Sequence, residues 1–277
     1  MPRSSEVVLA ALVLVAPAVG RTPAGSAPPP ALAPALARLG FVERRVERSS
    51  EKGWHEASEG TPLRLGERLR TGADALARLD LPWMTMTISP ASTVGFPDDY
   101  LLCAVLEQGR MQLHSEKSEI LKVVTGEAEV RGRGRAVVRR EGNATLVTSL
   151  AGRFFVEGAG KTVALPEATG TIVRGGQPPL PPQALPPPPH GLVPGSDPRY
   201  VAPGDTVSLI WTPRGAAHQI EVLPVGSDEV LIQRDVGAPP WRVAIPWSGA
   251  FRWRVAARDE RGLEGKPSAD GLICVDK

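Results

Sequence analysis

The stretch GWHEASEGTPLRLGERLRTGADALARLDL, residues 53–81, decides how the rest of the chain is interpreted. Leu63 and Leu65 alternate with polar neighbours, and the same alternation resumes at Leu79 and Leu81 after a further glycine. Alternation with a period of two is typical of a half-buried strand, and glycines at short intervals mark turns. The stretch therefore predicts several short β-strands.

The end of this stretch permits a second interpretation. Residues 74–81 could form a helix, because Ala and Leu are good helix formers. The turn signal before them and Pro82 directly after them favour a strand, since proline stops a helix quickly.

Apolar alternation continues downstream, through residues 84–88 and 101–113 and then across 120–165. In the last region the pattern predicts short runs separated by glycines at positions 126, 132, 142, 152 and 158. Closely spaced strands and turns predict an all-β unit over residues 38–180. The pattern alone leaves a sandwich and a solenoid both open.

The same region resembles the FecR domain, a periplasmic family, over residues 45–180. The residues that carry the resemblance are Trp54, Gly60, Leu63, Gly66, Leu69, Arg70, Thr71, Gly72, Ala77, Leu79, Ile88, Pro90, Thr93, Leu106, Gly109, Val124, Thr125, Gly126, the segment 152–165, and 170–176 with Pro178 and Pro179. The resemblance implies a solenoid-like arrangement of short strands around a narrow core. One departure is Ala151-Gly152-Arg153 before Phe154, where the family usually has Arg-Gly-Thr before an aromatic residue.

In founding FecR proteins this domain relays the state of an outer-membrane receptor to a cytoplasmic sigma factor. Only six residues precede the apolar run that starts at Val7. We therefore do not expect this chain to hold a sigma factor itself, and the resemblance does not transfer an anti-sigma function.

Residues 1–20 match a secretory signal peptide, with an apolar run at 7–16 and the small residues Ala18-Val19-Gly20 at its end. A short buried helix is the alternative. A membrane-spanning signal anchor is less favoured still, since ten apolar residues are about half of a membrane span. Residues 21–37 are rich in Pro and Ala and are expected to form an extended spacer. The prediction is a periplasmic or secreted protein without a membrane span after cleavage.

Residues 181–199 are proline-rich and predict an extended linker. Residues 200–277 carry six alternating segments and predict a small β-sandwich. In the segment 250–259, Phe251, Trp253 and Val255 are expected to point inward and the arginines between them outward; the segment is similar to the last strands of fibronectin type III and other immunoglobulin-like modules. Trp211 is expected to fill the core.

No catalytic, cofactor or metal site is expected. None of the four histidines has a second ligand at metal-binding spacing, and His218 is expected at an exposed strand edge. Cys103 and Cys274 fall in different predicted units, so two separate buried thiols are favoured over a disulfide between them. Thirty-two basic and thirty acidic residues leave a net charge of +2, which predicts no nucleic-acid partner.

One charged feature is a candidate binding surface, and its residues are Arg131, Arg133, Arg135, Arg139 and Arg140. Without interleaved aromatic residues, the first three favour a solvated hairpin tip over a nucleic-acid patch. An anionic glycan or an acidic protein could dock on this surface.

The sequence therefore predicts an exported, non-enzymatic binding or scaffold protein of the bacterial cell envelope. Its expected partners are an envelope polysaccharide, peptidoglycan, or a periplasmic or outer-membrane protein. The alternative is a periplasmic signalling component that senses or bridges envelope proteins in a FecR-like regulatory system.

Overall fold

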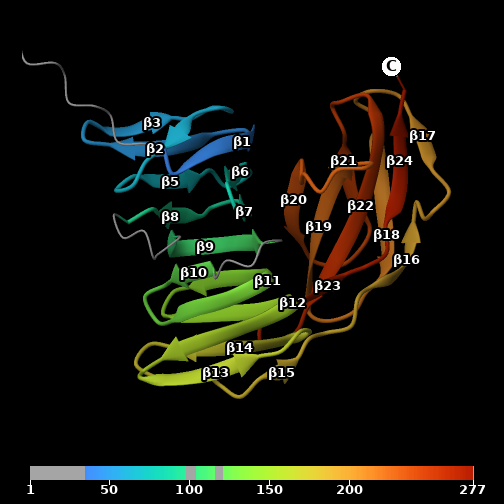
Figure 1. The fold of residues 1–277 in the computed structure, drawn as a ribbon. Coiled ribbons are helices and arrows are strands. Elements are labelled where there is room, and N and C mark those ends of the chain that lie inside the picture. Colours follow the sequence, from blue (N-terminus) through green and yellow to red (C-terminus); the bar gives the residue numbers. More distant parts are fainter. Residues whose placement is uncertain (1–34, 98–103, 116–120, 277) are drawn as a thin grey trace, which may run out of the picture. The chain divides into compact units, whose positions relative to one another are not determined.

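The computed structural model describes residues 35–97, 104–115 and 121–276, and every regular element in them is a β-strand (Figure 1). The strands form three sheets, which confirms the all-β prediction. The predicted signal peptide, all but the end of the spacer, and Cys103 lie outside the described residues. The part of the chain that is described holds no helix suited to crossing a membrane. Residues 33–277 form one compact unit.

The first lobe of this unit is a single sheet of fifteen strands. They are β1 (Ala37–Glu43), β2 (Val46–Ser50), β3 (Gly53–Glu56), β4 (Pro62–Leu63), β5 (Arg68–Thr71), β6 (Leu76–Leu81), β7 (Met84–Ile88), β8 (Thr93–Gly95), β9 (Ala104–His114), β10 (Leu121–Val124), β11 (Glu129–Glu141), β12 (Ala144–Gly158), β13 (Lys161–Leu165), β14 (Thr169–Arg174) and β15 (Gln183–Ala184). β6 pairs with β1 and β7, so the residues that also permitted a helix form a strand.

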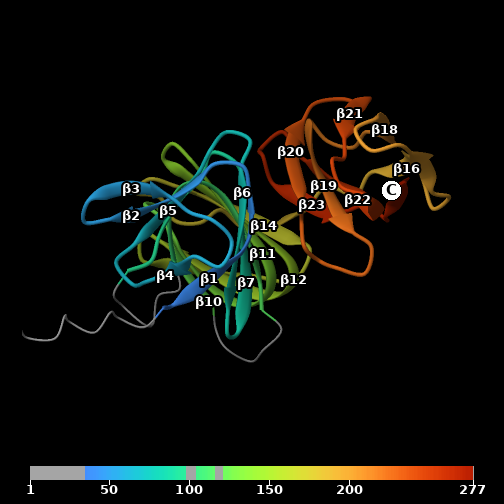
Figure 2. The same ribbon diagram turned by 90° about the horizontal axis from the view of Figure 1, so that it is seen from above.

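Three long strands give this lobe two layers. β9, β11 and β12 each pair with one set of neighbours in their first half and another in their second. One layer contains β1, β6, β7 and β14, and the other contains β2, β5, β8, β10 and β13. Figure 2 shows β2, β3 and β5 on one side of the lobe and β6 and β7 on the other.

A single apolar core lies between the layers and receives side chains from both. Met86 and Ile88 of β7, Leu106 of β9 and Phe154 of β12 are among its fully buried members. The period-two alternation is confirmed at Leu79 and Leu81, which are buried in this core. It is wrong at Leu63 and Leu65, because β4 ends at the buried Leu63 and Leu65 is only partly buried.

The prediction of short strands between glycines is wrong for β11 and β12, which have 13 and 15 residues. Gly134 and Gly152 face each other across these strands, and both have positive φ, 111° and 84°. The two glycines form a corner at which the strands pass from one layer to the other, because glycine adopts positive φ without steric cost. The arginines expected at a hairpin tip therefore lie within a strand, and the tip is at Gly142-Asn143.

Gly134→Ala is expected to lower the free energy of unfolding by about 1–3 kcal/mol from backbone strain alone. A Cβ there would also overlap the carbonyl oxygen of Ala151, which adds to the loss. Urea denaturation measures the effect. Gly142→Ala is the matched control, since it has positive φ but no atom near its Cβ position. Equal losses in both variants would contradict the role of the corner.

The second lobe contains two sheets of three and six strands. Its strands are β16 (His190–Val193), β17 (Arg199–Val201), β18 (Thr206–Thr212), β19 (Ala217–Pro224), β20 (Ile232–Val236), β21 (Trp241–Ala244), β22 (Gly249–Arg258), β23 (Glu264–Pro267) and β24 (Gly271–Val275). All six segments predicted here contain a strand. The segment expected to be an extended linker, residues 181–199, holds two short strands, β15 and β16, and the first residue of β17.

The core of the second lobe receives residues from both of its sheets. Trp211, Phe251, Trp253 and Val255 are buried in it, as predicted. The prediction for His218 is wrong: it is 3% exposed, because β19 lies between β22 and β20 rather than at an edge. Its Nδ1 lies 2.7 Å from the carbonyl oxygen of Gly237.

Candidate binding cleft

A buried ion pair joins the two lobes. Arg110 of β9 donates two hydrogen bonds to Glu264 of β23, of 3.0 Å from Nε and 2.6 Å from Nη2. The two side chains are only 5% and 6% exposed. Paired, parallel bonds between a guanidinium and a carboxylate are both strong and directional. They fix the position of β23 against β9.

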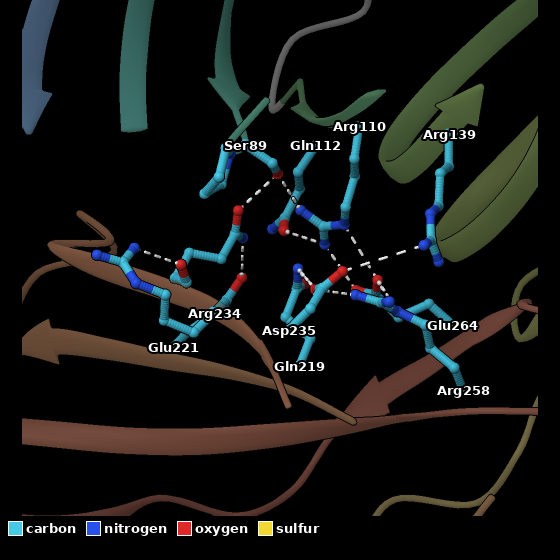
Figure 3. A network of polar contacts seen from close by, with 12 residues as sticks. Ser89, Arg110, Gln112, Arg139, Gln219, Glu221, Arg234, Asp235, Arg258 and Glu264 are labelled. Carbon is cyan, nitrogen blue, oxygen red and sulfur yellow. Dashed lines mark hydrogen bonds and ion pairs between the residues drawn. The ribbon is translucent and has the colours of Figure 1, made fainter. Parts of the chain in front are cut away.

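A second set of buried hydrogen bonds runs beside this pair (Figure 3). Ser89 donates to Gln233 Oε1 at 2.5 Å, and Arg110 donates to Ser89 at 2.9 Å. Gln233 donates in turn to Glu221 at 3.0 Å, and Glu221 accepts a bond of 2.8 Å from Arg254. Every charge in this chain of contacts has an opposite partner, which is what burial requires.

A third group surrounds Asp235 of β20. Arg258 and Gln219 both donate to its carboxylate, and Arg139 of β11 lies 4.0 Å from it. Arg139 also pairs with Glu141 on its own strand. Asp235 therefore links the far end of β11 to the second lobe, and Figure 3 shows these side chains converging there.

Apolar contacts and outer ion pairs complete the join. Buried Leu76 of the first lobe clusters with Leu223 and Val230 of the second. At the other end of the join, Leu146 and Ile172 cluster with Leu263. Outer ion pairs connect Arg78 with Glu229 at 3.2 Å, Arg234 with Glu43 at 3.6 Å, and Lys266 with Glu167 at 2.5 Å.

A cleft of about 710 Å³ opens beside these contacts, with walls from both lobes. Its charged lining residues are Arg110, Arg139, Arg140, Arg234, Glu107, Glu141 and Asp235, and its polar ones are Ser89, Gln108, Gln219 and Gln233. The described residues that line it include no aromatic side chain. Gln219 is 2% exposed, and its Oε1 is buried without a hydrogen-bond partner among the described residues. The cleft can accept a polar ligand that carries both donors and acceptors.

The buried carboxylates make folding sensitive to acid. Burial alone would raise the pKa of Glu221, but the charges of Arg254 and Arg110 and hydrogen bonds from Arg254 and Gln233 outweigh it and lower the pKa. The pKa of Asp235 is lowered in the same way, by Arg258 above all, against the effect of burial. A lowered pKa in the folded state stabilises the protein above the unfolded value, about 4 for Asp and Glu. We expect stability to be lost as the pH falls from there through the folded values.

Thermal melts between pH 7 and pH 3 measure this loss. Glu221→Gln should flatten the acid limb, since it removes one of the groups that bind a proton on unfolding. Glu43 opposes this loss of stability in acid. Burial raises its pKa, against the charges of Arg234 and Arg44, so its protonation favours the folded state. A wild-type melting temperature that does not fall below pH 4 would contradict the expectation.

The structure separates the five arginines of the predicted binding surface. Arg131 and Arg133 are exposed on one layer of the first lobe, whereas Arg135 and Arg139 face the second lobe. Arg140 points to the opposite side of β11 from Arg139 and donates two hydrogen bonds to Glu127, of 3.0 Å and 2.9 Å. The five therefore do not form one patch, because side chains alternate along a strand.

The residues that hold the cleft together were not found from the sequence. Arg110 and Glu264 are 154 residues apart, and nothing in the pattern around either one points to the other. The described residues contain no group of three or more His, Cys, Asp and Glu placed to hold a metal ion. Cys274 is a partly buried free thiol.

No protein-family model matches the sequence, and no curated protein is significantly similar to it. Two crystal structures of a “putative anti-sigma factor” from Parabacteroides distasonis ATCC 8503, at 2.50 Å and 1.65 Å resolution, are distantly similar in fold. Each comparison has a TM-score of 0.37 at 16% identity and covers 42% of this chain and 59% of the other. The chain thus matches less than two thirds of the length of that protein.

Proposed function

We propose that the chain is an exported, non-enzymatic binding or scaffold protein of the bacterial cell envelope, and that its target enters the cleft between the lobes. The observation that carries the proposal is the buried pair Arg110–Glu264, which joins the two lobes beside a cleft of about 710 Å³. Preformed recesses of some hundreds of Å³ are the usual sites of ligand binding in proteins.

The lining of the cleft favours binding over catalysis. Each of its four arginines is already bonded: Arg110 to Glu264, Arg139 to Glu141, Arg140 to Glu127 and Arg234 to the carbonyl oxygen of Gln233. Such groups present fixed donors and acceptors rather than a free base or nucleophile. A target with both charges and many hydrogen-bonding groups suits them, as in peptidoglycan or an envelope protein segment; an envelope polysaccharide is the third candidate.

The finer assignment of the two lobes belongs to the same proposal. We take the first lobe as a FecR-like domain, on the residues between 45 and 180 that resemble that family. The solenoid that the resemblance implied is not found among the described residues of this lobe, whose strands form one fifteen-stranded sheet. We take the second as an immunoglobulin-like sandwich, because its two sheets share one core around Trp253. Periplasmic or secreted location rests on the apolar segment near the start of the sequence.

Co-sedimentation with purified cell-wall sacculi, at low and high salt, tests the proposal. Ala73→Trp should weaken the binding that survives high salt, since this exposed residue lines the cleft and the larger ring would obstruct it. Ala202→Trp, on the exposed surface of the second lobe, is the matched control. Salt-resistant binding that is undiminished in Ala73→Trp would exclude the cleft, and no wild-type binding would exclude the cell wall as its target.

The second candidate is a periplasmic signalling component. Its support is the FecR resemblance, together with a join between the lobes that rests on ion pairs and hydrogen bonds a partner could compete for. Cross-linking in the periplasm tests it: capture of an outer-membrane receptor or a membrane-bound regulator would favour signalling, and capture of wall material alone would count against it.

A further inference from the structure

The outward face of β11 and β12 carries a basic and aromatic surface on the layer that does not contain the cleft. Directly opposed residues of antiparallel strands point to the same side of a sheet. Arg131 lies opposite Phe155, and Arg133 lies opposite Arg153. All four are exposed, whereas Phe154 and Val156, which flank Phe155 on β12, are fully buried in the core.

The three arginines of this face differ in their partners. Arg131 is neutralised by two carboxylates, Glu129 and Glu157, each at 3.1 Å. Among the described residues, neither Arg133 nor Arg153 has a carboxylate within ion-pair distance. Like charges directly opposite each other destabilise a strand pair. The fold thus carries two unneutralised guanidinium groups side by side, an arrangement that an anion from outside would relieve.

Phe155 adds an aromatic group beside the two arginines. It is 42% exposed, among the most exposed large apolar residues of the described chain. It is two residues from Arg153 on β12, which places the ring in the next row, about 7 Å along the strand. A ring beside two guanidinium groups can hold an apolar face of a ligand while the arginines hold its acidic groups.

We propose that Arg133, Arg153 and Phe155 form a docking surface for an anionic polysaccharide, with its carboxylates or phosphates on the arginines and a sugar ring on Phe155. The surface is separate from the cleft, whose lining contains none of these residues. The choice of a polysaccharide as the ligand rests on the proposed envelope function. The inference that the surface binds an anion rests only on the unneutralised charges of Arg133 and Arg153.

The position of this surface in the sheet disfavours an acidic peptide. Extended peptides commonly bind by adding a strand to a free sheet edge. β10 pairs with the outer side of β11 at residues 129–132, and β13 pairs with the outer side of β12 at residues 154–158, so the free edge at Arg133 and Arg153 is too short to template a strand. A polymer can therefore lie only across the side chains, where charge and stacking select it.

Binding of the full chain to polygalacturonate, measured by calorimetry at low and raised salt, tests the proposal. Arg153→Glu should weaken binding by about tenfold or more, the worth of one charge-assisted contact. Its melting temperature should stay the same or rise, because an opposite-charge pair with Arg133 replaces a like-charge pair. Arg131→Gln is the matched control, already neutralised, and should change the affinity by less than about threefold.

Phe155→Ser should weaken binding while leaving its salt dependence unchanged, since it removes no charge. Neutral dextran should not bind. Equal binding of polyglutamate would replace the polysaccharide with an acidic peptide, and no binding of polygalacturonate by the wild type would overturn the proposal. Ala73→Trp should bind polygalacturonate normally, so that failure of the cleft and failure of this surface are distinguishable.

Discussion

Replacing Glu264 with glutamine should lower the free energy of unfolding by about 3–5 kcal/mol, the usual cost of breaking a buried ion pair. The loss arises because Arg110, 5% exposed, would keep its positive charge without its partner carboxylate. Its remaining acceptors are the hydroxyl of Ser89 and the amide oxygen of Gln112, which are neutral. Equilibrium unfolding in urea measures the change.

Two controls separate this effect from a general loss of contacts. Arg110→Met combined with Glu264→Leu should recover part of the stability, because apolar pairs of similar volume often replace buried ion pairs at little cost. The recovery is incomplete because Arg258 also loses the Glu264 carboxylate, 3.6 Å from its Nε. Glu167→Gln breaks the exposed pair with Lys266 and should leave the unfolding curve unchanged. A Glu264→Gln protein as stable as the wild type would show that this pair does not hold the lobes.

The sequence was informative wherever one side of a strand faces an apolar core. The burial of Leu79, Met86 and Trp253 follows from alternation alone, because burial repeats every second residue along their strands. The path of the long strands β11 and β12 could not be predicted from alternation. A glycine such as Gly152 can end a strand or turn a corner within it, and only the pairing partners of β12 decide which.

The outward sides of strands were harder to interpret. Arg254 alternates with Trp253 and points away from the core, as predicted, yet it is only 8% exposed. Its hydrogen bond to Glu221 lies in the join between the lobes. Pattern reasoning assigns a residue to one face of a sheet, whereas solvent exposure also depends on whether a second layer covers that face.

The candidate site could be predicted only in part: two of the five arginines of the predicted binding surface, Arg139 and Arg140, line the cleft. Arg139 and Arg140 look like one cluster in the sequence, but alternation sends them to opposite faces of β11, where Asp235 and Glu127 meet them. Ion pairs between distant segments leave no periodic signal, because a single charged residue suffices on each side. The cleft is a property of how the lobes meet.

Trp253→Ala should lower the free energy of unfolding of the second lobe by about 3–5 kcal/mol, the range for removing a large buried aromatic side chain. Trp253 is fully buried, and its Nε1 donates a hydrogen bond of 3.0 Å to the carbonyl oxygen of Pro194. Its ring meets that of Trp211 edge to face at 6.4 Å. Gly271 lies opposite it on β24, where a Cβ would overlap the indole.

Trp253→Phe is the intermediate variant, because it keeps an aromatic ring in the core and removes the hydrogen bond together with part of the indole volume. It should lose less than the alanine variant but leave the carbonyl of Pro194 without its donor, at a cost of about 1–3 kcal/mol. Trp247→Ala is the control at a position that is 37% exposed, and it should cost far less. Similar unfolding curves for the Trp253 and Trp247 alanine variants would refute the central place of Trp253, since burial is what distinguishes them.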